Sequence, residues 1–303
     1  MSIVDDLLQQ TSRTFALAIP LLPEPTRNEV GIGYLLFRII DTFEDATHWA
    51  PQDRVDALSR FVDVLGRPVG QEARALANDC GEWPPVDHAG YRELLQRLPF
   101  VLERFQEIEP RAREIMRAHV ERSARGMSAF LSRGDGSATP PLETLQDLRD
   151  YCYVVAGIVG EMLTELYLLD RPQLAEPAPR LRQRAPRFGE GLQLVNIIKD
   201  ARPDAAEGRV YLPRQASLGE VFAVAHEDLE IAGAYTEELR LAGVELGLVA
   251  FNALIMQLAR ANLNLLRTHG LGSKLSRLEV MRILAHVLSG LGVETEHAAQ
   301  PEG

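Results

Sequence analysis

Apolar residues recur every three or four positions over most of the chain, which is the spacing of amphipathic or buried helices. The clearest examples are residues 91–108, 110–131 and 278–291. No alternating run of β-branched residues competes with this pattern. The breaks are short and rich in helix-ending residues, at 66–70, 80–87, 132–141 and 170–179. We therefore predict an all-α fold of about ten helices, forming a single domain over residues 1–303.

One of these helices carries a polar seam on an otherwise apolar surface, in the stretch GIGYLLFRIIDTFEDA that begins at Gly31. Tyr34, Arg38, Asp41 and Asp45 follow one another at offsets of four, three and four residues. On an ideal helix these side chains fall within a stripe roughly 60° wide, with the next acid, a glutamate, at its edge. The intervening residues are apolar, so we expect this seam to face a polar feature inside the protein.

A second helix repeats the arrangement in GLQLVNIIKDARPD. Gln193, Asn196, Asp200 and Asp204 lie at offsets of three, four and four, within roughly 80° of an ideal helix. A single pair of acids with this spacing is usually solvated or stabilises a helix dipole. Two seams with the same order of polar residues favour a shared active site instead. Paired carboxylates suit Mg²⁺, which keeps several waters and shares its remaining positions with substrate phosphate. Pro203 predicts a kink or an end to this helix, with Asp204 in the exit turn.

Composition limits the partners and the compartment. The chain has 46% hydrophobic and 25% charged residues, as an ordinary soluble protein has, and its net charge is -11. The only lysines are Lys199 and Lys274, so nothing resembles a nucleic-acid-binding surface. Cys80 and Cys152 cannot form a disulfide framework, which favours a reducing compartment.

The chain also lacks the pattern of a targeting or membrane-spanning segment. Its first residues include acids where a secretory signal would have basic residues, so we expect a cytoplasmic protein without a signal peptide. The longest uncharged apolar segment, residues 246–259, is too short to span a bilayer and is interpreted as a buried helix. Further along, Ser217 and Glu220 have the spacing of a capping box that begins a helix.

Four motifs, in this order, resemble those of the head-to-head trans-prenyltransferases, the squalene and phytoene synthase family. They are SRTFALAI at 12–19, YLLFRIIDTFED at 34–45, YCYVVAGIVG at 151–160 and LQLVNIIKDARPDAAEGRVYLP at 192–213. The resemblance implies an isoprenoid synthase helical fold with a central cavity, a magnesium-dependent prenyltransferase activity, and prenyl diphosphates as substrates.

The resemblance also implies roles for individual residues. Two or three Mg²⁺ ions would be held by Asp41, Glu44, Asp45, Asp200 and Asp204. Diphosphate, or the phosphates of NADPH, would be bound by Arg13, Arg38, Lys199 and Arg209. The polar mouth of the pocket would be lined by Tyr34, Tyr151, Gln193 and Asn196. Beside the metal-binding acids, we nominate Tyr151 to position the leaving diphosphate or to accept a proton.

The chemistry of such a reaction requires both polar and apolar surroundings. Breaking a carbon–oxygen bond to diphosphate requires neutralisation of the leaving group, which Mg²⁺ and arginine supply. The carbocation that remains must be kept from water, and the apolar segments 153–163 and 246–258 could wall a dry chamber. Within the first of these, Gly157 and Gly160 either let helices approach closely or leave room for a substrate chain.

Three alternatives remain open on the sequence. The motif DTFED resembles the squalene-type pattern, which favours two farnesyl diphosphates and hydride transfer from NADPH. A phytoene synthase would use geranylgeranyl diphosphate, and a third enzyme would stop at the cyclopropyl diphosphate. Pro203 stands where squalene synthases commonly have an acid, and Lys199 where many have arginine.

Two other classes are less favoured by the residues present. A class I terpene cyclase would carry a second metal motif with Asn and Ser before Glu, which we do not find. A noncatalytic family relative that acts in assembly would have eroded carboxylates, whereas all five acids are present. We also expect peripheral contact with a membrane, because the product would be insoluble in water.

Overall fold

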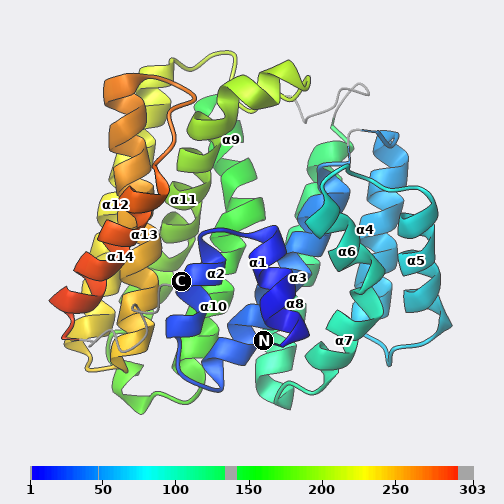
Figure 1. The fold of residues 1–303 in the computed structure, drawn as a ribbon, viewed down its shortest axis with the longest axis horizontal. Helices are drawn as coiled ribbons and strands as arrows, with labels where there is room; N and C mark the ends of the chain where they lie inside the picture. The colour runs from blue at the N-terminus through cyan, green and yellow to red at the C-terminus, as the bar shows by residue number, and fades with distance from the viewer. Residues whose placement is uncertain (1, 47, 134–141, 293–303) are drawn as a thin grey trace, which may run out of the picture.

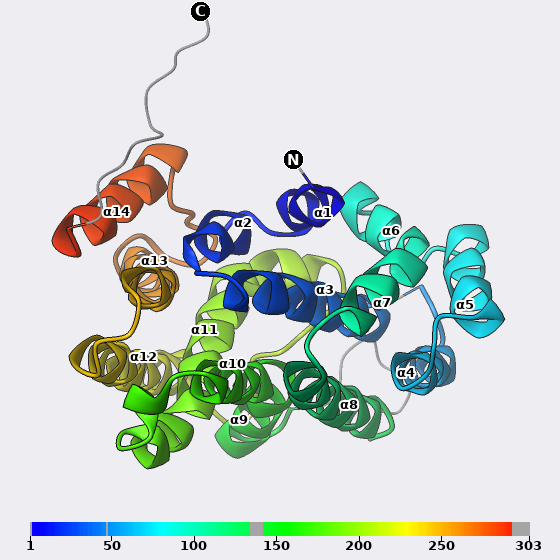
Figure 2. The ribbon, with the colours of Figure 1, turned by 90° about the horizontal axis from the view of Figure 1, so that it is seen from below.

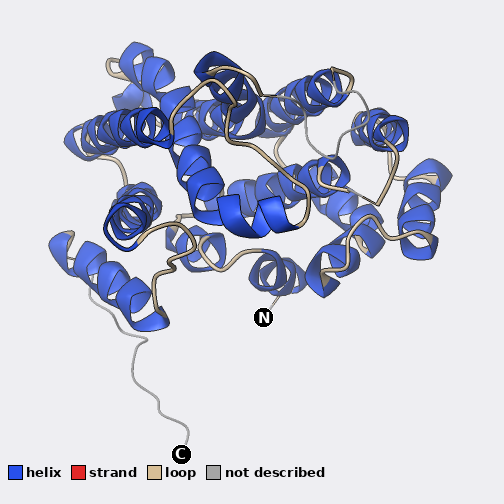
Figure 3. Ribbon diagram, turned by 90° about the horizontal axis from the view of Figure 1, so that it is seen from above, coloured by secondary structure: helices blue, strands red, loops and turns tan. Residues whose placement is uncertain are grey.

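The computed structural model of the chain describes residues 2–46, 48–133 and 142–292, and within these ranges it contains helices and no strand (Figure 3). The predicted all-α fold class is therefore confirmed. The helices are α1 (Ile3–Thr11), α2 (Phe15–Ala18), α3 (Thr26–Glu44), α4 (Pro51–Leu65), α5 (Gln71–Glu82), α6 (Ala89–Gln96), α7 (Leu98–Gln106), α8 (Pro110–Leu131), α9 (Leu145–Cys152), α10 (Ile158–Leu169), α11 (Ala178–Ala206), α12 (Leu218–Leu241), α13 (Leu246–His269) and α14 (Arg277–Gly290). Short 3₁₀ turns occupy Ile19–Leu21 and Pro172–Leu174.

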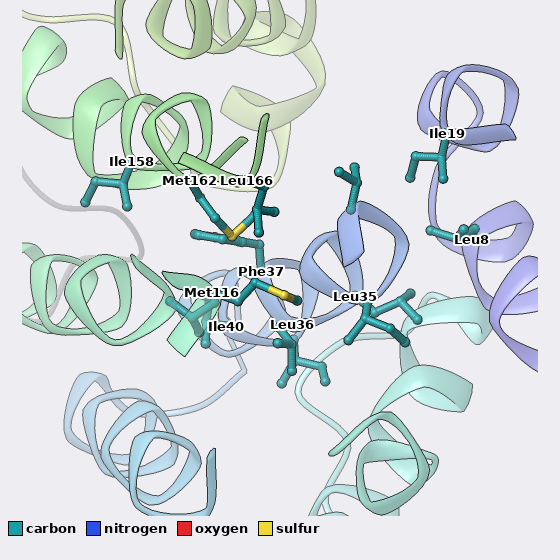
Figure 4. Close-up of a cluster of buried hydrophobic side chains, with 14 of the residues drawn as sticks. Leu8, Ile19, Leu35, Leu36, Phe37, Ile40, Met116, Ile158, Met162 and Leu166 are labelled. Carbon is teal, nitrogen blue, oxygen red and sulfur yellow. The ribbon is translucent and has the colours of Figure 1, made fainter. Parts of the chain in front are cut away.

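Helix α3 lies at the centre of the molecule, with α4 to α8 on one side and α11 to α14 on the other (Figures 1 and 2). It packs against α1, α4, α7, α8 and α10, while α11 packs against α10, α12 and α13. The apolar residues between the polar positions of α3 are fully buried. Figure 4 shows Phe37 of α3 beside Met116 of α8 and Met162 of α10 in this core. The central position of α3 explains why a helix so apolar can also present a polar seam to an internal cavity.

Some helix boundaries differ from the sequence prediction. Residues 91–108 form two helices, α6 and α7, separated at Arg97. The cause is Pro99 in the first turn of α7, because its ring cannot donate a backbone hydrogen bond and therefore suits a helix start. Such divisions give more helices in the described residues than the ten predicted. Helix α11 continues past Pro203 to Ala206, so Asp204 lies in its last turn and not beyond it.

The segment between α9 and α10 is a π-helical turn, Tyr153–Gly157, and its wider winding interrupts a stretch predicted as regular helix. Helix α11 crosses this turn and the start of α10 in backbone contact. A Cβ atom on Gly160 would lie 2.1 Å from the carbonyl oxygen of Ala185, and one on Gly189 would lie 2.0 Å from that of Ala156. Only glycine allows this approach, so the close helix approach considered for Gly160 is confirmed.

The predicted capping box is also confirmed at the start of α12. The Ser217 hydroxyl accepts a hydrogen bond from the backbone of Glu220, whose carboxylate accepts one from the backbone of Ser217. These reciprocal bonds satisfy two backbone donors that the first turn of a helix leaves without intrahelical partners.

Two stretches are long and apolar enough to cross a membrane by length and composition, Leu145–Leu169 and Leu246–His269. The sequence analysis predicted no such span. Core helices of globular proteins pass the same test, and 61% of the apolar window of the second stretch is buried inside the fold. Residues 246–259, predicted as a buried helix, lie within α13, which packs against α11, α12 and α14.

Candidate active site

The two polar seams, apart from Tyr34, line one cavity of about 470 Å³ between α3 and α11. This is the arrangement that the sequence predicted. The lining residues from α3 and its carboxyl end are Arg38, Asp41, Glu44 and Asp45, and those from α11 are Gln193, Asn196, Asp200 and Asp204. Of the other candidates, Tyr151 and Arg209 also line this cavity.

Burial, with neighbouring carboxylates adding to its effect, raises the pKa values of Asp41, Glu44 and Asp204 in the cavity wall. Burial raises the pKa of Asp41 to about 7, with the Arg38 guanidinium opposing and the Asp45 charge adding to the effect. Burial and the charges of Asp45 and Asp41 raise the pKa of Glu44 well above its usual range. Across the cavity, the pKa of Asp204 is raised by burial first, and the charge of Asp45 contributes. The acids of α3 and α11 therefore repel one another across the same space.

Each acid that faces the cavity has a donor close to it, and these donors come from five separate positions. The pairs are Asp41 with Arg38 at 3.5 Å, Asp45 with Tyr211 at 3.1 Å, Asp200 with Lys199 at 3.3 Å, Asp204 with Arg209 at 2.7 Å and Glu44 with Tyr151 at 3.3 Å. These contacts partly offset the repulsion and hold the carboxylates at the cavity wall.

Tyr151, nominated from the sequence, is buried against the acids of α3. Its hydroxyl donates to both carboxylate oxygens of Glu44, at 3.3 and 3.4 Å. Its ring stacks on that of Tyr211, with centroids 5.3 Å apart and planes inclined by 23°. The Tyr211 hydroxyl in turn donates to Asp45. Two stacked phenols thus connect α9 and the α11–α12 connection to the carboxyl end of α3.

Arg54 of α4 supports the same end of α3 from behind and was not singled out in the sequence. Only 2% of it is exposed, and its Nη1 donates to the carbonyl oxygen of Glu44 at 3.0 Å. A positive charge at this position also complements the negative end of the α3 dipole. Its charge lowers the pKa of Glu44 and so opposes part of the effect of burial.

The acids fit a hard divalent cation. Within the described residues, no three His, Cys, Asp or Glu side chains form a ready-made metal-binding group. The potential metal ligands that face the cavity are carboxylate oxygens, whose negative charges repel one another. A bound cation would relieve this repulsion. Mg²⁺ needs only one or two protein carboxylates because water and phosphate supply its other ligands. The donor set therefore suits Mg²⁺ that arrives with an anionic substrate.

An apolar chamber of about 140 Å³ adjoins the polar cavity and shares Arg38, Asp41, Val155, Gln193 and Asn196 with it. Its other walls are apolar side chains from α2, α3, α10, α11 and α13. The two predicted wall segments contribute to it, through residues 155–163 of the first and Phe251 and Ile255 of the second. Tyr34, expected at the polar mouth, lines this chamber. A chain attached to a diphosphate could thus lie in apolar surroundings.

Two of the nominated cations lie outside the lining of both spaces. Arg13 is exposed and lines neither the cavity nor the chamber. Lys199 lies beside the cavity, where it donates to Asn196 at 2.9 Å and pairs with Asp200. The roles predicted for both stay predictions.

Tyr91 of α6 and Lys274 of the α13–α14 connection line the polar cavity but were not nominated. Each is an isolated polar residue, so no periodic signal in the sequence distinguishes it. Tyr211 was also not nominated, although it stands within the quoted motif that carries Arg209.

Comparisons with known proteins agree with this geometry. The model of the squalene/phytoene synthase family matches residues 8–271. The squalene synthase of Eremothecium gossypii is 31% identical over 212 residues, which cover 69% of this chain and 45% of that protein. The squalene synthase of Homo sapiens is 29% identical over 211 residues, covering 69% and 45%. The match thus spans less than half the length of these curated relatives.

Solved structures give the same result for the fold. The complex of TcSQS with the ligand BPH1237 has a TM-score of 0.73 and 26% identity, with 98% of this chain and 92% of that chain covered. A dehydrosqualene synthase in complex with a ligand has a TM-score of 0.59 and covers 96% of each chain. At 22% identity the second likeness concerns the fold alone.

Proposed function

The chain belongs to the squalene/phytoene synthase family, and on this premise we propose that it joins two farnesyl diphosphates head to head, through presqualene diphosphate, to squalene with NADPH as the hydride donor. The observation that carries the proposal is that two rows of acids line one cavity, which continues into an apolar chamber. We further propose that residues 1–303 form one catalytic domain.

In the first step, one allylic carbon–oxygen bond breaks and diphosphate leaves. Mg²⁺ would be held by Asp41, Glu44, Asp45, Asp200 and Asp204, and the bound ions would neutralise the charge that develops on the leaving group. Arg38 faces both the cavity and the chamber, so its guanidinium can bind a diphosphate whose chain lies in the chamber. The breaking bond would then lie at the border between the polar and apolar spaces.

The allylic cation is then attacked by the double bond of the second farnesyl chain, and a proton is lost as the cyclopropane ring closes. The apolar walls keep water from the cation. Tyr151 lines the polar cavity, where its hydroxyl donates to Glu44, and it can orient the departing diphosphate, whose oxygens can accept the proton.

In the proposed second half-reaction, presqualene diphosphate loses its diphosphate and the rearranged cation receives a hydride. NADPH would be the co-substrate that donates this hydride. Of the four cations expected to bind diphosphate or the phosphates of NADPH, Arg38 and Arg209 line the cavity beside the acids, whereas Arg13 and Lys199 line neither space. Within the described residues these side chains therefore do not assemble a separate phosphate site for NADPH. The first half-reaction does not require NADPH, and the assay below tests whether the second does.

A product assay tests the proposal. Purified protein is incubated with Mg²⁺ and farnesyl diphosphate, with and without NADPH, and the extracted products are identified by mass. We expect a C30 hydrocarbon only when NADPH is present. A cyclopropyl diphosphate in both reactions would show that hydride delivery is missing, and consumption of geranylgeranyl diphosphate alone would favour a phytoene synthase.

Substitution of the acids tests the assignment of the site. Asp41→Asn and Asp200→Asn should each lower turnover by at least about a hundredfold, because each removes a charge that would hold Mg²⁺. Asp79→Asn, at an exposed ion pair with Arg60, is the matched control and should keep full activity. Retained activity in either cavity variant would refute the metal assignment.

No turnover by the unaltered protein with any prenyl diphosphate would favour a noncatalytic relative. Peripheral membrane contact stays a prediction.

A further inference from the structure

The guanidinium of Arg38 lies over two tyrosine rings. Its Cζ atom is 5.5 Å from the ring centroid of Tyr34 and 5.4 Å from that of Tyr91. Both distances are within the range of about 6 Å in which a cation is attracted to an aromatic face. Tyr34 precedes Arg38 by one turn of α3, whereas Tyr91 comes from α6. We call this pair of rings the aromatic clamp.

The two rings of the aromatic clamp are set by adjacent carbonyl groups at the end of α1. The Tyr34 hydroxyl donates to the carbonyl oxygen of Thr11 at 3.0 Å. Gly90, the residue before Tyr91, packs against the carbonyl group of Gln10, the residue before Thr11. A Cβ atom on Gly90 would lie 2.5 Å from that carbonyl oxygen. This close contact fixes the start of α6, and with it Tyr91, against α1.

The remaining contacts of Arg38 limit how its side chain can turn. Its Nε donates to the Tyr34 hydroxyl at 3.3 Å, and its Nη1 lies 3.5 Å from a carboxylate oxygen of Asp41. Loss of the Tyr91 ring would remove one of the two aromatic contacts of the guanidinium and leave the ion pair with Asp41 as a competing attraction. A planar cation that is free to turn offers its paired N–H groups to an anion less often.

We propose that Tyr91 is a positioning residue, which holds Arg38 so that its guanidinium can bind the diphosphate of the substrate. This inference rests on the proposed function. Tyr91 acts through its ring, and its effect on diphosphate binding passes through Arg38. The sequence gives no signal of this role, because Tyr91 stands outside all four family motifs.

Binding of inorganic diphosphate in the presence of Mg²⁺, measured by isothermal titration calorimetry, tests the inference without turnover. Tyr91→Leu should weaken binding about five- to thirtyfold, as expected for a partly buried cation–aromatic contact. Tyr91→Phe keeps the ring and should stay within about twofold of the unaltered protein. Phe100→Leu is the matched control, because Phe100 lies under Arg104, at 5.6 Å, outside the cavity lining.

A double substitution shows whether the effect passes through Arg38. In an Arg38→Ala background, Tyr91→Leu should cause no further loss of binding, since the group that Tyr91 positions is absent. Circular dichroism confirms folding, and Tyr91→Met serves in place of a leucine variant that does not fold.

The outcomes separate this inference from the proposed function. Unaltered diphosphate binding by Tyr91→Leu would overturn the role of Tyr91 alone. A loss in Tyr91→Phe as large as in Tyr91→Leu would also overturn it, because the hydroxyl would then be the group that matters. If the unaltered protein bound no diphosphate with Mg²⁺, the proposed function would fail, and the role of Tyr91 with it.

Discussion

Replacing Glu29 with glutamine should stabilise the protein at pH 8 and have little effect at pH 4.5. Glu29 lies in the first turn of α3, and only 5% of it is exposed. Burial raises the pKa of its carboxyl to about 7, the charge of Asp170 adds to this effect, and Arg171 opposes it. The folded state therefore keeps a proton that the unfolded chain has already released.

The sign of the effect follows from proton binding. Between the unfolded pKa of 4.5 and the folded pKa of about 7, the folded state binds more protons than the unfolded state. The free energy of unfolding must then fall as the pH rises through this window. Glutamine does not titrate, so a variant with glutamine at this position escapes the loss.

The difference between the two pKa values sets the magnitude. At about 1.36 kcal/mol for each pKa unit, the ionised Glu29 costs the folded state at most about 3 kcal/mol at pH 8. The amino-terminal end of α3 favours a negative charge by about 0.3 to 1 kcal/mol, which offsets part of that cost. We expect the variant to be more stable by about 1 to 3 kcal/mol at pH 8.

Urea unfolding of both proteins at pH 4.5, 6, 7 and 8 measures this difference. The gap between the unfolding midpoints should widen with pH, with most of the change below pH 8. Glu72→Gln, at an exposed pair with Arg67, is the control and should show no such trend. A gap that does not depend on pH, or a less stable Glu29→Gln at pH 8, would refute the reasoning.

Two further predictions concern the supports of the site. Arg54→Met should destabilise the protein by about 2 kcal/mol in urea unfolding, because the buried carbonyl of Glu44 loses a charged donor. The exposed Arg60→Met is its control, and equal midpoints for the two variants would contradict the prediction. Gly189→Ala should lower the melting temperature strongly, since its Cβ would lie 2.0 Å from the carbonyl oxygen of Ala156. A melting temperature equal to that of the unaltered protein would show that the crossing can relax.

The polar seams could be predicted because helical periodicity determines which side chains share a face. The spacing of Asp41 and Asp45, and of Asp200 and Asp204, was enough to place each pair on one side of its helix. That the two faces meet at one cavity was inferred from their similarity, and the structure confirms it. Polar side chains that recur at helical spacing along one helix are therefore the part of this site that can be predicted from the sequence.

Residues brought to the site singly could not be predicted. Tyr91, Lys274 and Arg54 come from three different segments, and each owes its place to tertiary packing and not to a local pattern. The division at Arg97 is different, because Pro99 was visible in the sequence and is a known helix starter. The apolar periodicity continues through both helices, so it predicted one continuous helix where the chain forms two.

The contact between Gly160 and Gly189 constrains how this protein can adapt to other substrates. Both glycines line the apolar chamber, and their helices already touch through main-chain atoms. No exchange of side chains can bring these two helices closer, and a larger residue at either position would separate them. Under the proposed function, a change in the length of the accepted chain would therefore come from the larger side chains that line the chamber, among them Phe15, Val30 and Phe251, and not from these two glycines.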